Sequence, residues 1–164
     1  MFMEIFRKKK RQLIVEGFVS SMRDLIELTI ENNSIDQSRY MNHMHYLLEC
    51  KTLVIAAPRQ IGKTELLKEI FSKHRTLYIC HNQCTANEIA RGFTNRRFDF
   101  DIVSISKFKC PSPGIDFSSK YDLILFDECF TGHNFENVYN SLQLYKTMNY
   151  NLTIIALQSP AMLK

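Results

Sequence analysis

The chain has 164 residues, a net charge of +4 and 45% apolar residues, which suits one globular domain with a buried core. No apolar run reaches the roughly 20 residues that cross a bilayer, and the N-terminal stretch is not typical of a signal peptide. These features argue against a membrane protein. The five cysteines are an odd number, as expected of reduced thiols, so we predict a cytoplasmic protein.

The N-terminal part of the chain is basic and helical in pattern. Residues 12–32 carry apolar side chains at helical spacing and end at an Asn-Asn-Ser break, which predicts a helix. A second helix is expected over 38–49. We therefore divide the chain into an N-terminal segment, 1–37, and a core domain, 38–164. The basic residues from Lys8 to Arg11 are either a solvated surface or a contact for a nucleic-acid backbone.

Beyond residue 50, short apolar runs alternate with helical segments. The predicted strands are 52–57, 76–80, 101–106, 122–126 and 152–157. The predicted helices are 64–74, 85–93 and 134–148, the second with a cap at Asn82 or Thr85, and the Pro- and Gly-containing segment 109–120 is expected to be a loop. Nearly continuous apolar strands that alternate with helices predict an α/β fold. We expect a mostly parallel five-stranded sheet covered on both faces.

The stretch APRQIGKTE, residues 57–65, almost matches the phosphate-binding pattern G-x-x-x-x-G-K-[ST]. It lies between a predicted strand and a predicted helix, where backbone N–H groups can bind phosphate oxygens. Ala57 replaces the first glycine, but its methyl group is compatible with an extended strand end. Gly62 permits close approach, Lys63 can reach the β- and γ-phosphates, and the Thr64 hydroxyl can bind Mg²⁺. The predicted nucleotide loop comprises Pro58, Arg59, Gln60, Ile61, Gly62, Lys63, Thr64 and Glu65.

A second motif follows 64 residues after Lys63, where the apolar strand of YDLILFDE ends in Asp127 and Glu128. This is the Walker B pattern of P-loop ATPases that hydrolyse through a glutamate. Asp127 can hold Mg²⁺ through water, and Glu128 can orient and deprotonate the attacking water. The last predicted strand would place Gln158 and Ser159 beside the first strand, near a γ-phosphate.

The motifs APRQIGKT, LILFDE and LQSP together resemble the ATPase domain of the large terminase subunit, the viral DNA-packaging motor of tailed phages and herpesviruses. The resemblance spans residues 38–160, and Arg59-Gln60 is the part that is specific to terminases. It implies a P-loop NTPase three-layer sandwich that uses ATP and Mg²⁺. Thr64 and Asp127 would bind the metal ion, and Lys63, Glu128 and Arg59 would be catalytic, Arg59 by stabilising charge on the transferred phosphate. Tyr40 lies where the family has an adenine-recognising Tyr-Gln.

The resemblance also implies partners and a location. Duplex DNA and viral packaging or replication proteins are the expected partners, a homo-oligomer is compatible with the family, and the host cytoplasm is the expected compartment. Position 41 is methionine rather than the glutamine of the family, so the resemblance does not extend to the adenine-recognising pair. The sequence ends four residues after Pro160, so cleavage of DNA is not assigned to this chain.

Two other functions compete with this interpretation. One is a nucleotide-binding regulatory module that binds a motor or a host protein without turnover. The other is a nucleotide kinase, in which Arg91, Arg96 and Arg97 would clamp phosphates.

Overall fold

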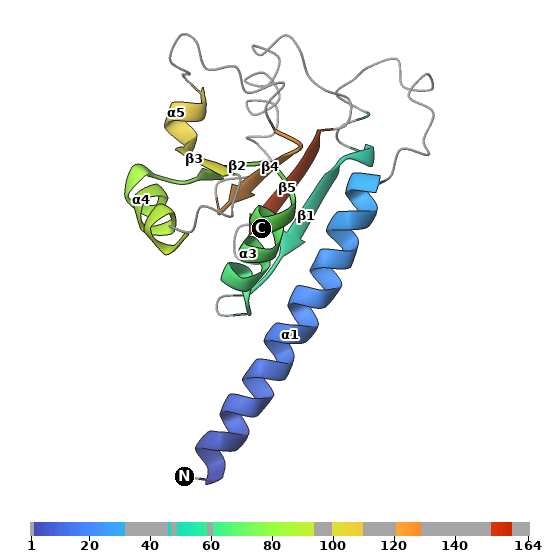
Figure 1. Ribbon diagram of the computed structural model, residues 1–164, viewed down its shortest axis with the longest axis vertical. Coiled ribbons are helices and arrows are strands. Elements are labelled where there is room, and N and C mark those ends of the chain that lie inside the picture. The colour runs from blue at the N-terminus through green and yellow to red at the C-terminus, as the bar shows by residue number, and fades with distance from the viewer. Residues whose placement is uncertain are drawn as a thin grey trace.

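The computed structural model describes residues 2–31, 46, 49–58, 61–93, 100–109, 121–128 and 152–158. Figure 1 shows the arrangement of their helices and strands. The elements are α1 (Phe2–Glu31), β1 (Thr52–Ala56), α3 (Lys63–Lys73), β2 (Thr76–Cys80), α4 (Gln83–Gly92), β3 (Phe100–Ser104), α5 (Ile105–Lys109), β4 (Leu123–Asp127) and β5 (Thr153–Gln158). The predicted helix over 134–148 and nearly all of the predicted loop over 109–120 lie outside the described residues. Of the predicted helix over 38–49, the structure describes residues 46 and 49, both helical.

The strands form a five-stranded sheet in the order β1-β5-β4-β2-β3, and every neighbouring pair is parallel. The predicted α/β class and five-stranded sheet are therefore confirmed. The predicted end of the third strand is wrong, because the strand expected over 101–106 ends at Ser104 and Ile105 begins α5. The Ser104 hydroxyl accepts a bond from the Lys107 amide at 3.4 Å, a capping contact that favours a helix start over a longer strand.

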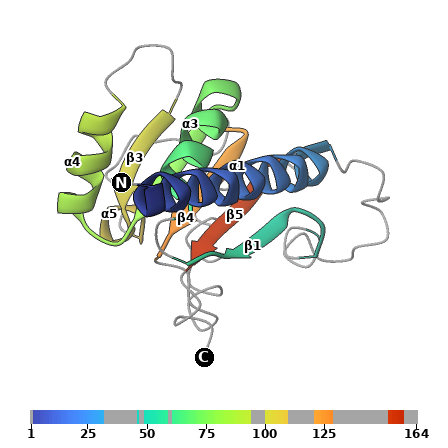
Figure 2. The ribbon, with the colours of Figure 1, turned by 90° about the horizontal axis from the view of Figure 1, so that it is seen from below.

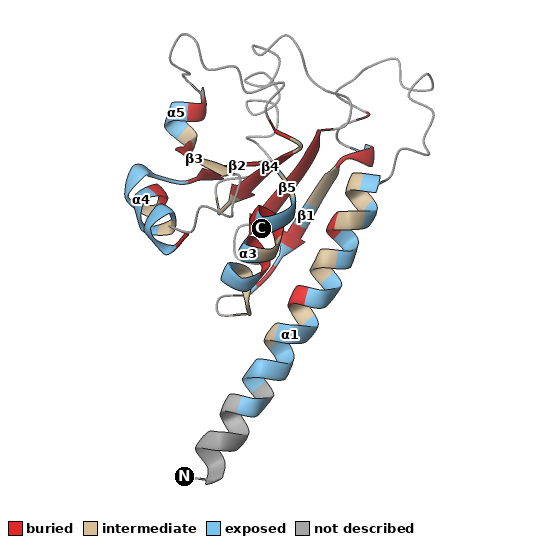
Figure 3. Cartoon of the chain, in the orientation of Figure 1, coloured by how far each residue is buried: buried red, intermediate tan, exposed pale blue. Residues whose placement is uncertain are grey.

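Helices α1, α3 and α4 lie on one side of the sheet (Figure 2). On one face, α1, α3 and α4 pack over one apolar cluster that includes Val19, Leu66 and Ala86. On the other face, Phe108 of α5 belongs to a second cluster with Leu77 and Ile124. The strands between these layers are largely buried (Figure 3), as expected of a parallel sheet covered on both sides.

Helix α1 begins at Phe2, well before the predicted start at residue 12, so the basic run lies inside the helix. The missed segment is rich in lysine and arginine, which favour helix formation but carry no apolar periodicity. A stripe at three- and four-residue spacing packs on the sheet layer: Val15, Val19, Met22, Ile26 and Ile30. Other apolar residues of this helix are exposed: Leu13 (68%), Ile14 (50%), Leu25 (43%) and Leu28 (64%).

Polar contacts hold α1 against the sheet and α3. The buried Lys51 donates to the carbonyl oxygens of Ile30 at 3.0 Å and Thr29 at 3.4 Å, at the end of α1. A cation there is favourable because the last carbonyls of a helix carry partial negative charge. Glu27 of α1 also pairs with Lys73 of α3 at 2.8 Å. These contacts fix α1 against the residue before β1 and against the end of α3. Within the described residues, no helix combines the length and apolarity needed to cross a membrane.

Candidate functional site

Three neighbouring strands end at one edge of the sheet. Strand β5 lies between β1 and β4, and its Gln158 pairs with Ala56 while Leu157 pairs with Asp127. Hydrogen bonds continue past the strand ends, since the Ala57 amide donates to the Gln158 carbonyl and the Glu128 amide to the Leu157 carbonyl, both at 2.9 Å. The prediction that Gln158 lies beside the first strand is confirmed. Carboxyl ends of parallel strands are where α/β proteins commonly build sites.

The segment after β1 turns sharply into α3. Gly62 is the N-cap residue of α3 and has φ 110°, a conformation that other residues rarely adopt. Ala57 is buried, and among the described residues with a side chain only Glu128 has a positive φ. The alanine in place of the first glycine of the pattern therefore lies in a backbone conformation that its methyl group permits. The first turn of α3 begins with Lys63 and Thr64, where helix amides have no partner within the helix.

Lys63 and Glu128 form an ion pair across the end of the sheet. The Lys63 Nζ lies 2.5 Å from the Glu128 Oε1, although the two residues are 65 positions apart. Their side chains are 18% and 34% exposed, so the pair is only partly screened by solvent. Glu128 has φ 53°, which ends β4 and turns the chain.

Asp127 is held differently from its neighbour. It follows Leu123 and Leu125 along β4 at alternate positions, so its side chain lies on the α3 side of the sheet. The Tyr78 hydroxyl donates a hydrogen bond to Asp127 Oδ2, whereas Oδ1 is buried without a hydrogen-bond partner. Burial raises the pKa of Asp127; the Tyr78 hydrogen bond and the Lys63 charge oppose this, and the Glu128 charge adds to it.

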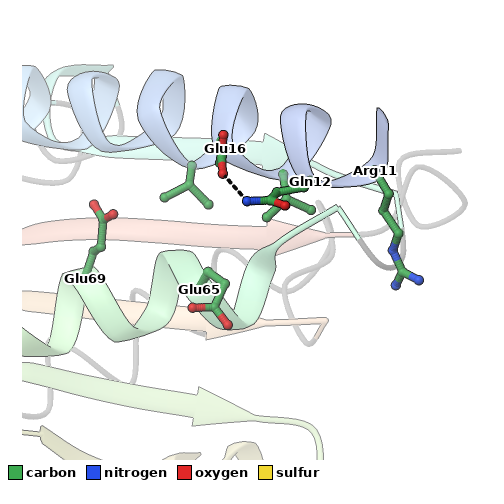
Figure 4. Close-up of a pocket in the computed structure, with 7 residues that line it drawn as sticks. Arg11, Gln12, Glu16, Glu65 and Glu69 are labelled. Atoms are coloured by element: carbon green, nitrogen blue, oxygen red, sulfur yellow. Dashed lines mark hydrogen bonds between the residues drawn. The ribbon is translucent and has the colours of Figure 1, made fainter. Parts of the chain in front are cut away.

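These groups line a cleft of about 600 Å³ at the edge of the sheet, which we call the edge cleft. Its walls come from the start of α3, Tyr78 in the middle of β2, the end of β4, helix α4, and Arg11 and Val15 of α1. An adjoining groove of about 610 Å³ runs between α1 and α3 and shares Arg11, Val15 and Glu65 with the edge cleft. Figure 4 shows that groove, with Gln12 and Glu16 on α1 opposite Glu65 and Glu69 on α3, and with Arg11 at one end. Both volumes are in the range of small-molecule sites.

The structure brings together most, but not all, of the predicted site residues. Gly62, Lys63, Thr64, Glu65, Asp127 and Glu128 all line the edge cleft. Pro58 is exposed just after β1, and Ile61 packs against the apolar cluster under α3 rather than lining the cleft. Arg59, Gln60, Tyr40 and Ser159 lie outside the described residues, as do Arg96 and Arg97, whereas Arg91 is exposed on α4.

Sequence reasoning missed several residues of the edge cleft. Tyr78 lies in the middle of the apolar strand β2. Its hydroxyl group was the one feature in the sequence that could have indicated a role in the site. Glu88 comes from α4, Phe93 is the residue that follows α4, and Val15 comes from α1. Nothing local in the sequence connects those helices to the phosphate-binding pattern, because their contacts depend on how the layers pack.

The fold is thus an α/β domain with a parallel sheet whose carboxyl edge carries a lysine, a threonine and two acids in one cleft. No protein-family model matches the chain, and no curated protein matches it.

Proposed function

We propose that the chain binds ATP with Mg²⁺ and hydrolyses it, as a small ATPase that resembles the terminase motor subunit. One observation carries this proposal. Lys63, at the start of α3, and Glu128, after β4, meet in one cleft with Thr64 and Asp127. Two patterns far apart in the sequence therefore bring a lysine, a threonine and two acids into one cleft, which supports a role in nucleotide hydrolysis.

The described residues fit a magnesium ion. Mg²⁺ prefers oxygen ligands and usually takes one or two from the protein, with nucleotide phosphates and waters completing its shell. Asp127 Oδ1 is buried and has no hydrogen-bond partner, and Thr64 lines the same cleft. A metal ion held by these two residues would neutralise charge on the phosphate oxygens.

The Lys63–Glu128 ion pair suggests the order of events. Triphosphate oxygens compete for the Lys63 ammonium group, which releases the Glu128 carboxylate. Glu128 then accepts a proton from a water molecule whose oxygen attacks the γ-phosphorus. The bond from the γ-phosphorus to the bridging oxygen breaks, and ADP and inorganic phosphate form.

Duplex DNA is the partner that we propose for this activity. The basic run lies within α1, and Arg11 of that run lines the edge cleft. Contacts between these side chains and a phosphate backbone would weaken steeply with salt. DNA affinity that is absent or independent of salt would remove this part of the proposal.

The test is steady-state ATP hydrolysis by the purified chain, with and without duplex DNA. Lys63→Ala should abolish turnover, and Glu128→Gln should lower kcat by about 10²- to 10⁴-fold, the usual contribution of a general base, while ATP binding persists. Equal turnover in the Glu128→Gln protein and the wild type would refute the assigned mechanism.

The same ion pair supports a second candidate, a regulatory module that binds nucleotide without turnover. Glu128 held by Lys63 at 2.5 Å cannot activate water. If the pair persists with nucleotide bound, calorimetry will detect ATP binding although no phosphate is released with or without DNA.

A further inference from the structure

Tyr78 and Asp127 form a hydrogen-bonded pair in the lining of the edge cleft. Tyr78 is fully buried on β2, and its register partner on β4 is Leu125, two residues before Asp127. Residues two apart on a strand share a face, and a long side chain reaches its diagonal neighbour on the next strand. The tyrosine hydroxyl therefore reaches the Asp127 carboxylate, and it donates to Oδ2.

Helix α3 holds the tyrosine ring in place. The ring packs edge-on against Phe71, with centroids 5.8 Å apart and an interplanar angle of 87°. Phe71 is itself buried on α3, the helix that begins with Lys63 and Thr64. One rigid element thus supplies the proposed phosphate and metal contacts and also orients the ring that holds the acid.

The two carboxylate oxygens of Asp127 differ in their hydrogen bonding. Oδ2 accepts from Tyr78, whereas Oδ1 is buried and has no hydrogen-bond partner. Buried polar atoms are nearly always satisfied in folded proteins, so an exception calls for an explanation such as an ion. Partners that orient a ligating carboxylate are a general feature of metal sites.

We propose that Tyr78 is a positioning residue for metal binding, which fixes the Asp127 carboxylate so that Oδ1 is the oxygen presented to Mg²⁺. The inference rests on the proposed function. The simpler alternative is that a buried tyrosine satisfies its own hydroxyl on the nearest acceptor.

The chain contains a matched control for that alternative. Tyr121, also buried, donates its hydroxyl to Asp101. Asp101 lies near the beginning of β3, and Tyr121 precedes β4, so this pair is at the opposite edge of the sheet from the cleft. Tyr121→Phe removes a comparable hydrogen bond without touching Asp127.

The experiment measures metal binding directly. The protein–ADP complex is titrated with Mn²⁺ and free Mn²⁺ is followed by electron paramagnetic resonance, while ADP affinity in EDTA is measured by calorimetry. Tyr78→Phe should weaken Mn²⁺ binding by about 10- to 100-fold, the usual cost of losing such a partner, and leave metal-free ADP affinity unchanged. Tyr121→Phe should leave both unchanged.

Each other outcome counts against a specific claim. Wild-type Mn²⁺ affinity in Tyr78→Phe, or an equal loss in Tyr121→Phe, overturns the role of Tyr78 and leaves the proposed function standing. A wild-type protein that binds neither ADP nor Mn²⁺ overturns both. If Tyr78→Phe does not fold, Phe71→Leu replaces it, because that change keeps the hydroxyl but loosens the ring. Unchanged Mn²⁺ binding in a folded Phe71→Leu protein likewise overturns the role.

Discussion

Replacement of Gly62 by alanine tests how the loop before α3 is built. Gly62 has φ 110°, and an added Cβ would lie 2.8 Å from the Val15 Cγ1 atom of α1. The substitution therefore introduces two separate penalties, one in the backbone and one in the packing between α1 and the loop. No real Cβ contact is that short, so either Val15 or the loop must move.

The size of the effect follows from these two terms. A residue other than glycine in a sparsely populated backbone region costs about 1–3 kcal/mol, and overpacking a buried contact costs about 1–3 kcal/mol. Gly62→Ala should therefore lower the free energy of unfolding by about 2–6 kcal/mol, a large share of the roughly 5–15 kcal/mol of a typical domain.

Urea denaturation followed by circular dichroism measures the loss, and a double-mutant cycle separates its parts. Val15→Ala in the Gly62→Ala background removes the clash but not the backbone penalty. The two changes should therefore show a coupling energy of about 0.5–3 kcal/mol, as contacting residues do. A Gly62→Ala protein as stable as the wild type would refute the backbone argument. A coupling energy near zero would refute the contact between α1 and the loop.

Three further changes have defined expectations. Glu128→Gly should be more stable than Glu128→Ala by about 1 kcal/mol, because the residue has φ 53° and glycine avoids the left-handed penalty; thermal melts that rank them in the opposite order would contradict this. Asn82→Ala removes the side-chain acceptor for the Thr85 amide and should cost about 0.5–2 kcal/mol, measured by urea unfolding. The hydrogen bonds from Arg75 lower the pKa of Asp122 in the folded protein. Their contribution to the free energy of unfolding is therefore fully present above a pH of about 4, the ordinary pKa of aspartate. It is lost as the pH falls through the lowered pKa. The pair is exposed, so this contribution is only about 0.2–1 kcal/mol; Arg75→Ala should abolish it, and an unchanged acid dependence of unfolding would contradict the assignment.

Much of the fold could be predicted because its signals are local. The strands are short apolar runs, and α3 carries Leu66, Leu67, Ile70 and Phe71 on one buried face, so pattern and chain order led to the parallel sheet. The cap at Asn82 is also local and is observed. The start of α1 could not be predicted from apolar periodicity, because the basic run over 7–11 interrupts that periodicity between Phe6 and Leu13. The end of β3 could not be predicted either, because it depends on one contact, the hydrogen bond from the Lys107 amide to the Ser104 hydroxyl.

The site was predictable only where its motifs are contiguous. Lys63 and Thr64 follow from the loop pattern, and Asp127 and Glu128 from the strand that precedes them. Tyr78 and Val15 could not be assigned to the site in this way. Tyr78 reaches Asp127 only because β2 and β4 are neighbours in a particular register, and Val15 meets Gly62 only because polar and apolar contacts dock α1 on α3.

The backbone at Glu128 explains how two adjacent acids come to share one cleft. In a continuous strand, successive side chains point to opposite faces of the sheet, so Asp127 and Glu128 would lie on different sides. Asp127 keeps the strand geometry and meets Tyr78 on the α3 side. Glu128 leaves the strand with φ 53°, and its carboxylate meets Lys63 on that same side. The unfavourable backbone conformation at position 128 thus lets two consecutive acids face the same cleft, as the proposed roles of Asp127 and Glu128 require. The ranking of glycine above alanine at position 128 tests whether that backbone conformation is unfavourable.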